Sequence, residues 1–239
     1  MQEISWKDNL RVAWFGSFLT GASISLVVPF MPIFVEQLGI EQDQVAFYAG
    51  LAISVSAVSA ALVSPIWGIL ADKYGRKPMM IRAGLAMTIT MGGLAFVPNI
   101  YWLLFLRLLN GVFTGFVPNA TALIASQVPK DKSGAALGTL STGVVAGTLT
   151  GPFVGGFIAE IFGIRNVFLL VGAFLFLAAI LTIFFIKEDF QPAAKEKAIP
   201  TKEVFSSFKY PRLLVNLFLT SFVIQFSAQS IGPILALYV

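Results

Sequence analysis

Seven stretches of this sequence run for about 20 residues or more with almost no charged side chain, the length that an α-helix needs to cross a bilayer core of roughly 30 Å. Only helices and closed barrels satisfy every backbone polar group in lipid. We therefore expect seven membrane-spanning helices and an all-α integral membrane protein. Their expected bounds are 12–35, 46–70, 79–97, 102–125, 135–159, 167–186 and 213–239.

The composition excludes several classes of protein. Only 12% of the residues are charged, whereas soluble domains carry about 25%. The absence of histidine and cysteine removes the usual proton shuttle and the commonest zinc ligands. Neither GxGxxG nor GxxxxGK[ST] occurs. We expect no enzymatic activity, no metal site, no bound cofactor and no nucleic-acid partner.

The basic residues predict the orientation. Fourteen of the sixteen Lys and Arg residues lie near the N-terminus or in every second loop, while Arg165 lies on the opposite side and Arg107 inside the fourth span. Because basic loops stay in the cytoplasm, we expect a cytoplasmic N-terminus. The second loop is assigned four of these bases: Lys73, Arg76, Lys77 and Arg82.

The polar stretch 187–212 divides the chain. It mixes both signs of charge and contains Pro192, Pro200 and Pro211, as linkers do. We predict a six-span bundle over 1–186, a cytoplasmic linker over 187–212, and the first span of a second bundle over 213–239. The string FLT begins related segments at 18 and 218, which indicates a weak internal repeat.

The second loop carries the sharpest pattern, the string GILADKYGRKP at 68–78. Small residues let helix ends approach, a glycine permits a tight turn, and an acid among bases supplies an ion-pair lock beside the membrane. Such a lock distinguishes two helix arrangements; the alternative is a basic loop with an incidental aspartate. The predicted gate consists of Gly68, Asp72, Gly75, Arg76 and Lys77.

Arg107 lies inside the fourth span, in the string RLLNGVFTG. A charged side chain at the centre of a span costs about 2.5 kcal/mol or more, so Arg107 should find an acceptor in the protein interior or in a wet cavity. The alternative is that it reaches the membrane surface along its own helix. We predict a functional role for Arg107.

The fifth span reads GVVAGTLTGPFVGG from position 143. Glycines at every fourth position form a smooth ridge on one helix face, which permits close contact with another helix. A proline adds a bend. The alternative is ordinary close packing with no further role. The residues concerned are Gly143, Gly147, Gly151, Pro152, Gly155 and Gly156.

These patterns resemble signatures of the major facilitator superfamily. The loop string fits G-x-L-A-D-x-x-G-R-K, Arg107 and Gly111 resemble the R-x-x-x-G motif, and VVPFMP at 27–32 with G-P-x-x-G-G at 151–156 resembles its drug:proton antiporters. The resemblance implies two related bundles, proton coupling through Arg107 and an antiporter glycine motif. The chain would then be a truncated half that does not transport alone.

By this resemblance the protein exports amphipathic drugs and dyes, including fluoroquinolone-like compounds, across the bacterial cytoplasmic membrane in exchange for protons, with the proton gradient as energy source. It is expected to be monomeric. The first span lacks the carboxylate that some relatives have, so the proton site is not located. Polar residues at suitable depth are candidates for substrate binding, or else for helix-to-helix hydrogen bonds: Ser25, Asn119, Gln225 and Gln229.

Two other functions stay open. The first is an exporter of the same fold that is specific for one metabolite or sugar. The second is a membrane scaffold or receptor that moves no substrate, since topology alone says nothing about transport.

Overall fold

The computed structural model describes residues 5–190, 215–217, 219–224 and 226–227. Within these residues, six segments are long and apolar enough to cross a membrane. The helices are α1 (Trp6–Gln37), α2 (Gln42–Tyr74), α3 (Arg76–Gly93) with the 3-10 turn η1 (Leu94–Phe96), α4 (Ile100–Phe113), α5 (Phe116–Gln127), α6 (Ser133–Phe162) and α7 (Ile164–Phe185).

The six-span all-α bundle predicted from the sequence is confirmed, and the helices extend a few residues beyond the predicted apolar runs. Together α4 and α5 form the fourth span, Ile100–Gln127. Of the predicted seventh span, residues 215–217, 219–224 and 226–227 are helical, and the others lie outside the described residues.

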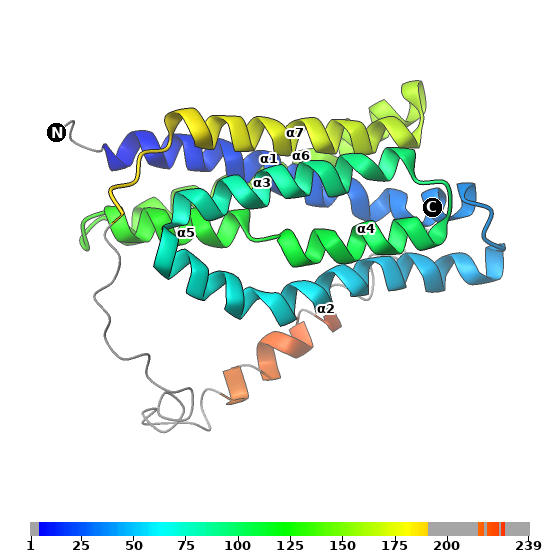
Figure 1. Ribbon diagram of the computed structural model, residues 1–239, viewed down its shortest axis with the longest axis horizontal. Helices are drawn as coiled ribbons and strands as arrows, with labels where there is room; N and C mark the ends of the chain where they lie inside the picture. Colours follow the sequence, from blue (N-terminus) through cyan, green and yellow to red (C-terminus); the bar gives the residue numbers. More distant parts are fainter. Residues whose placement is uncertain (1–4, 191–214, 218, 225, 228–239) are drawn as a thin grey trace.

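The helices lie side by side along the long axis of the molecule (Figure 1). The start of α1, the α2–α3 turn, the α5–α6 loop and the end of α7 meet at one end, on the left of the picture. We call this the basic end, because it gathers most of the bases in 5–190: Lys7, Arg11, Lys73, Arg76, Lys77, Lys130, Lys132 and Lys187.

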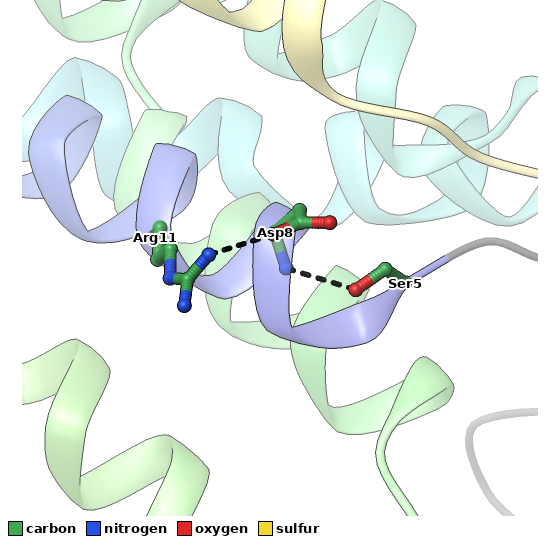
Figure 2. Close-up of polar contacts among 3 residues, drawn as sticks. All are labelled: Ser5, Asp8 and Arg11. Atoms are coloured by element: carbon green, nitrogen blue, oxygen red, sulfur yellow. Dashed lines mark hydrogen bonds and ion pairs between the residues drawn. The ribbon is translucent and has the colours of Figure 1, made fainter.

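The first turn of α1 at the basic end is fixed by short-range contacts, which Figure 2 shows. The Ser5 hydroxyl oxygen accepts a hydrogen bond from the Asp8 amide at 3.4 Å, and Arg11 pairs with the Asp8 carboxylate at 2.9 Å. A serine cap and an acid in the first turn both stabilise a helix start. They explain why α1 begins before the apolar run.

The core lies around α1 and α7. Phe34 of α1 and Phe168 of α7 are fully buried, with ring centroids 4.6 Å apart. In contrast, only 17% of the most apolar window of α2, and the same share for α6, is buried within this bundle, against 61% for α1. The outer faces of α2 and α6 are therefore apolar surfaces suited to lipid or to further protein.

The glycine ridge of α6 lies against α1. A β-carbon on Gly143 or Gly151 would lie 2.7 or 2.8 Å from a carbonyl oxygen of α1, and one on Gly147 would clash with the Phe18 carbonyl. On Gly155 it would meet Leu26. The two backbones thus approach as closely as the glycine spacing suggests. A β-carbon on Gly156 would meet nothing within 4 Å, so this glycine lies off the contact.

The fourth span is broken, which the sequence analysis did not predict. Thr114 is extended and Gly115 has φ +130°, so α4 ends at Phe113 and α5 begins at Phe116. Two residues together account for the break: Gly115 adopts a positive φ that other residues rarely take, and Pro118 has no amide to donate to the Thr114 carbonyl, with which its ring would clash in a continuous helix. A proline in the first turn of α5 is tolerated, because those amides are unpaired anyway.

The contact between α1 and α6 gives a test of the fold. We expect Gly147→Val to lower stability by about 1–3 kcal/mol, since the new methyl groups must push two backbones apart. The matched control is Gly156→Val on the same helix. The measurement is the apparent melting temperature of the purified protein in detergent: Gly147→Val should lower it clearly and Gly156→Val should not. Equal shifts would contradict the packing described.

Candidate functional site

The α2–α3 turn lies at the basic end and contains the predicted gate. Gly75, at φ +99°, ends α2 and precedes α3, so the turn takes one residue of positive φ. One turn earlier in the chain, the Asp72 carboxylate forms an ion pair with Arg76. The Asp72 side chain is 65% exposed and that of Arg76 is 29% exposed. An ion pair this exposed contributes only about 0–1 kcal/mol, which suits a contact that opens and closes.

Glu188, which the sequence analysis assigned to the linker, binds the same turn. Its two carboxylate oxygens accept hydrogen bonds from the backbone amides of Arg76 at 2.8 Å and Lys77 at 2.7 Å. These amides open α3 and have no partner inside the helix. A carboxylate there also faces the positive end of the helix dipole. A β-carbon on Gly75 would lie 2.8 Å from Glu188 Oε2, so a larger side chain would collide with this contact.

Glu188 is held in place by a second polar cluster. Asn9 of α1 donates to the Lys187 carbonyl at 2.6 Å and accepts from the Lys187 amide at 2.9 Å. Gln127, at the end of α5, donates to the same carbonyl at 3.0 Å and accepts from Asn9 at 2.7 Å. Residues 187–190 are thus fastened to the basic end, beside the α2–α3 turn.

Arg76 lines two cavities. The inner cavity, of about 360 Å³, lies between α2 and the α4–α5 break. The outer cavity, of about 530 Å³, lies between the α2–α3 turn and residues 187–190. Arg76 lines both, and Asp72 lines the outer one. Both partners of the ion pair therefore line the outer cavity, and its arginine lines the inner one as well.

The gate glycine Gly68 lines the inner cavity together with Trp67 and Asn119. A β-carbon on Gly68 would meet nothing within 4 Å, so this glycine does not bring two helices of the bundle together, contrary to the reason given for it from the sequence. Its small size instead leaves room in the cavity.

Arg107 lies in the interior, with 6% of its surface exposed. Its Nε donates to the Ala52 carbonyl of α2 at 3.1 Å, and Nη1 lies 3.7 Å from the Met91 sulfur of α3. The side chain therefore does not run to the membrane surface. Among the described residues no carboxylate pairs with it, so Arg107 is held by weak acceptors.

Of the four predicted substrate-binding residues, the two that the structure describes lie in different environments. The Ser25 hydroxyl donates to the Thr148 carbonyl of α6 at 2.7 Å, so it serves a helix-to-helix hydrogen bond. Asn119 lines the inner cavity, and its amide donates to the Gly115 carbonyl at 2.7 Å. Gln225 and Gln229 lie outside the described residues.

Arg82 requires a correction. It was expected in the second loop, but α3 begins at Arg76 and places Arg82 in its second turn. The early start follows from Gly75 and the cap made by Glu188. The Arg82 guanidinium carbon lies 3.5 Å from the centre of the Trp67 ring, and Nη2 donates to the Thr114 carbonyl at 3.1 Å.

Six membrane-spanning segments, a charged turn at one end and a buried arginine inside the bundle together describe a multi-pass membrane protein. The sequence pattern of the Major Facilitator Superfamily matches residues 13–239. The chain belongs to this superfamily, which confirms the resemblance drawn from the motifs.

Individual relatives share names related to drug resistance. The chain is 89% identical over its whole length to the multi-drug resistance efflux pump PmrA of Streptococcus pneumoniae, and it spans 60% of that protein. It is 53% identical over 99% of its length to the PmrA homolog of Lactococcus lactis, of which it spans 58%. For the multidrug resistance protein MdtG of Proteus mirabilis the identity is 50% over 98% of the chain and 59% of that protein.

Solved structures share the fold at low identity. The human organic anion transporter MFSD10 superposes with a TM-score of 0.68 at 18% identity, over 77% of this chain and 48% of that one. The POT family transporter PepTSo gives 0.69 at 13% identity, over 80% and 40% of the two chains. In both cases the chain corresponds to less than half of the known structure.

The hydrogen bonds between Glu188 and α3 should hold the α2–α3 turn closed to proteases. Glu188→Ala should raise the rate of trypsin cleavage after Lys73 or Arg76 by about tenfold, since hydrogen bonds to a charged group contribute about 1.5–3 kcal/mol. Asp189→Ala removes the neighbouring acid and should leave the rate unchanged. Cleavage is measured on the protein in membrane vesicles that expose the basic end. Equal cleavage of both variants would contradict the proposed cap.

Proposed function

We propose that the protein containing this chain exports amphipathic drugs and dyes through the bacterial cytoplasmic membrane in exchange for protons. The basic end faces the cytoplasm, which agrees with the positive-inside rule. Support comes from the superfamily membership and from the names of relatives that are 89% to 50% identical. The bundle over 1–186, the linker over 187–212 and a second bundle from 213 onward then act as the parts of one monomeric transporter.

One observation carries the mechanism: Arg76 lines both the inner and the outer cavity, and its guanidinium pairs with Asp72, which lines the outer one. When this pair forms, the inner cavity is separated from the cytoplasmic side. When it breaks, a substrate reaches the inner cavity from the cytoplasm. Gly75 and Lys77 set the turn. Glu188 fixes the N-terminal end of α3, which carries Arg76 of the ion pair.

Inside the bundle, Arg107 transmits the coupling. Its acceptors are weak and no described carboxylate neutralises it. The electrostatic energy of the guanidinium therefore changes strongly when a proton or a charged substrate arrives nearby. The glycine ridge against α1 keeps those two helices together while the two bundles move. Asn119 in the inner cavity, and Gln225 and Gln229 beyond the described residues, are proposed to contact substrate.

Reconstituted vesicles test the proposal. With the purified full-length protein and an acidic lumen, a fluorescent dye should accumulate inside, and chemically unrelated drugs should compete with it. An ionophore that collapses the gradient should stop accumulation. Dye movement that ignores the gradient would exclude antiport, competition by one compound class alone would indicate a narrow exporter, and no flux would indicate a scaffold or receptor.

The same vesicles test the gate. Asp72→Asn should change the transport rate by about twofold to fivefold, because an exposed ion pair contributes at most about 1 kcal/mol. Asp8→Asn is the matched control, since it breaks the other exposed ion pair at the basic end. If both variants transport at the wild-type rate, the Asp72–Arg76 pair is no gate.

A further inference from the structure

The break between α4 and α5 leaves backbone carbonyls without their helical partners, and side chains of other helices supply the missing donors. The Val112 carbonyl accepts from Trp67 Nε1 of α2 at 2.6 Å. The Thr114 carbonyl, whose helical partner would be Pro118, accepts from Arg82 Nη2 of α3 at 3.1 Å. Two neighbouring helices therefore hold the break.

Charge pairing does not explain why an arginine stands at position 82. No carboxylate of the described residues forms an ion pair with it, and its Nε and Nη1 are buried with no hydrogen-bond partner there. An apolar side chain would avoid this cost, since an unpaired buried donor is unfavourable. An arginine inside a membrane span is retained for function more often than for stability. What Arg82 gains is a stack on Trp67 and a bond to the broken helix.

Only an arginine suits this position. The planar guanidinium lies over the indole while one of its edges donates to a carbonyl, whereas the ammonium of lysine has no plane to stack. Trp67 is fixed in turn by its own bond to Val112. Arg82 and Trp67 together hold the end of α4, at its last turn and at its cap.

The break has room to move. Gly111, Thr114, Gly115, Pro118 and Asn119 all line the inner cavity. Gly115 accepts large changes in backbone dihedrals, and hinges in proteins are a few residues at element ends that absorb such changes. Arg107 lies on one side of the break and Asn119 on the other. A change of angle here would alter the distance between the proposed coupling residue and the cavity.

We propose that the α4–α5 break is a hinge of the transport cycle and that Arg82, stacked on Trp67, is the positioning residue that sets its angle by holding the Thr114 carbonyl. Release of this carbonyl lets α5 turn relative to α4. The inference deepens the proposed function, but its structural part stands without it, because the hinge angle is measurable in a protein that moves no substrate.

Spin labels measure the angle directly. Tyr101 of α4 and Thr121 of α5 are both exposed, and the chain contains no cysteine. Cysteines introduced at these two positions of the full-length protein, with any other cysteine replaced by serine, carry the labels. In a continuous helix the two α-carbons would lie about 30 Å apart, since each residue rises 1.5 Å. The broken span should give a shorter distance.

Arg82→Lys keeps the charge but loses the stack, so the distance distribution should broaden or gain a second population. Turnover should fall about tenfold with KM unchanged, since lysine cannot stack its head group on the indole and at the same time donate to the Thr114 carbonyl. Arg165→Lys is the matched control: Arg165, like Arg82, donates to backbone carbonyls at a helix end, in its case those of Ala95 and Val97, and it lies over the ring of Phe34 at the opposite end of the bundle. It should leave the distance unchanged.

Pro118→Ala is a second variant, in case Arg82→Lys does not fold. It restores the missing amide, so the distance should move toward that of a continuous helix. A wild-type distribution in both Arg82→Lys and Pro118→Ala would overturn the hinge, as would an equal shift in Arg165→Lys. A lower turnover of Arg82→Lys without any change of distance would overturn the positioning role of Arg82.

Discussion

The structure depends on one constraint: inside a bilayer, each backbone carbonyl and amide needs a partner within the protein. Five of the six described spans meet it with unbroken helical hydrogen bonding, and three of these, α1, α2 and α6, continue through proline residues. The fourth span does not, and there the donors come from side chains of α2 and α3. A helix break in lipid is tolerated only where the protein surrounds it, and here Trp67 and Arg82 supply the donors that the broken helix lacks.

The same constraint separates the charged residues into two kinds. At the basic end, Asp72 pairs with Arg76 and Glu188 accepts from two amides, so acids and donors match. In the interior, Arg82 and Arg107 meet carbonyls and a sulfur, with no acid among the described residues. Contacts that match charges thus join the elements at the basic end, while cations held by weak acceptors lie in the interior. In the mechanism proposed above, the first kind gates and the second kind responds.

Local patterns in the sequence predicted much of this. Apolar runs predicted the spans, because a helix that crosses a bilayer must have a minimum apolar length. Glycines at every fourth position predicted the face of α6 that lies on α1. The break had a signal that was not used: Pro118 stands three residues after Gly115, a combination typical of a new helix start. Glu188 had no such signal, since it meets α3 across more than a hundred residues of chain and was one acid among several in a polar stretch. Contacts between residues so far apart in the sequence can be identified only from the three-dimensional structure.

The most direct test concerns the donors at the break. In the full-length protein labelled with ¹⁵N-tryptophan, the indole N–H of Trp67, identified by its loss in Trp67→Phe, reports the bond to the Val112 carbonyl at 2.6 Å. The comparison is Trp102, whose side chain is 53% exposed. We predict that the Trp67 proton resonates downfield and exchanges with D₂O much more slowly than that of Trp102. Exchange of both at the same rate would contradict the account, because the broken span would then lack the partner on which its place in the membrane depends.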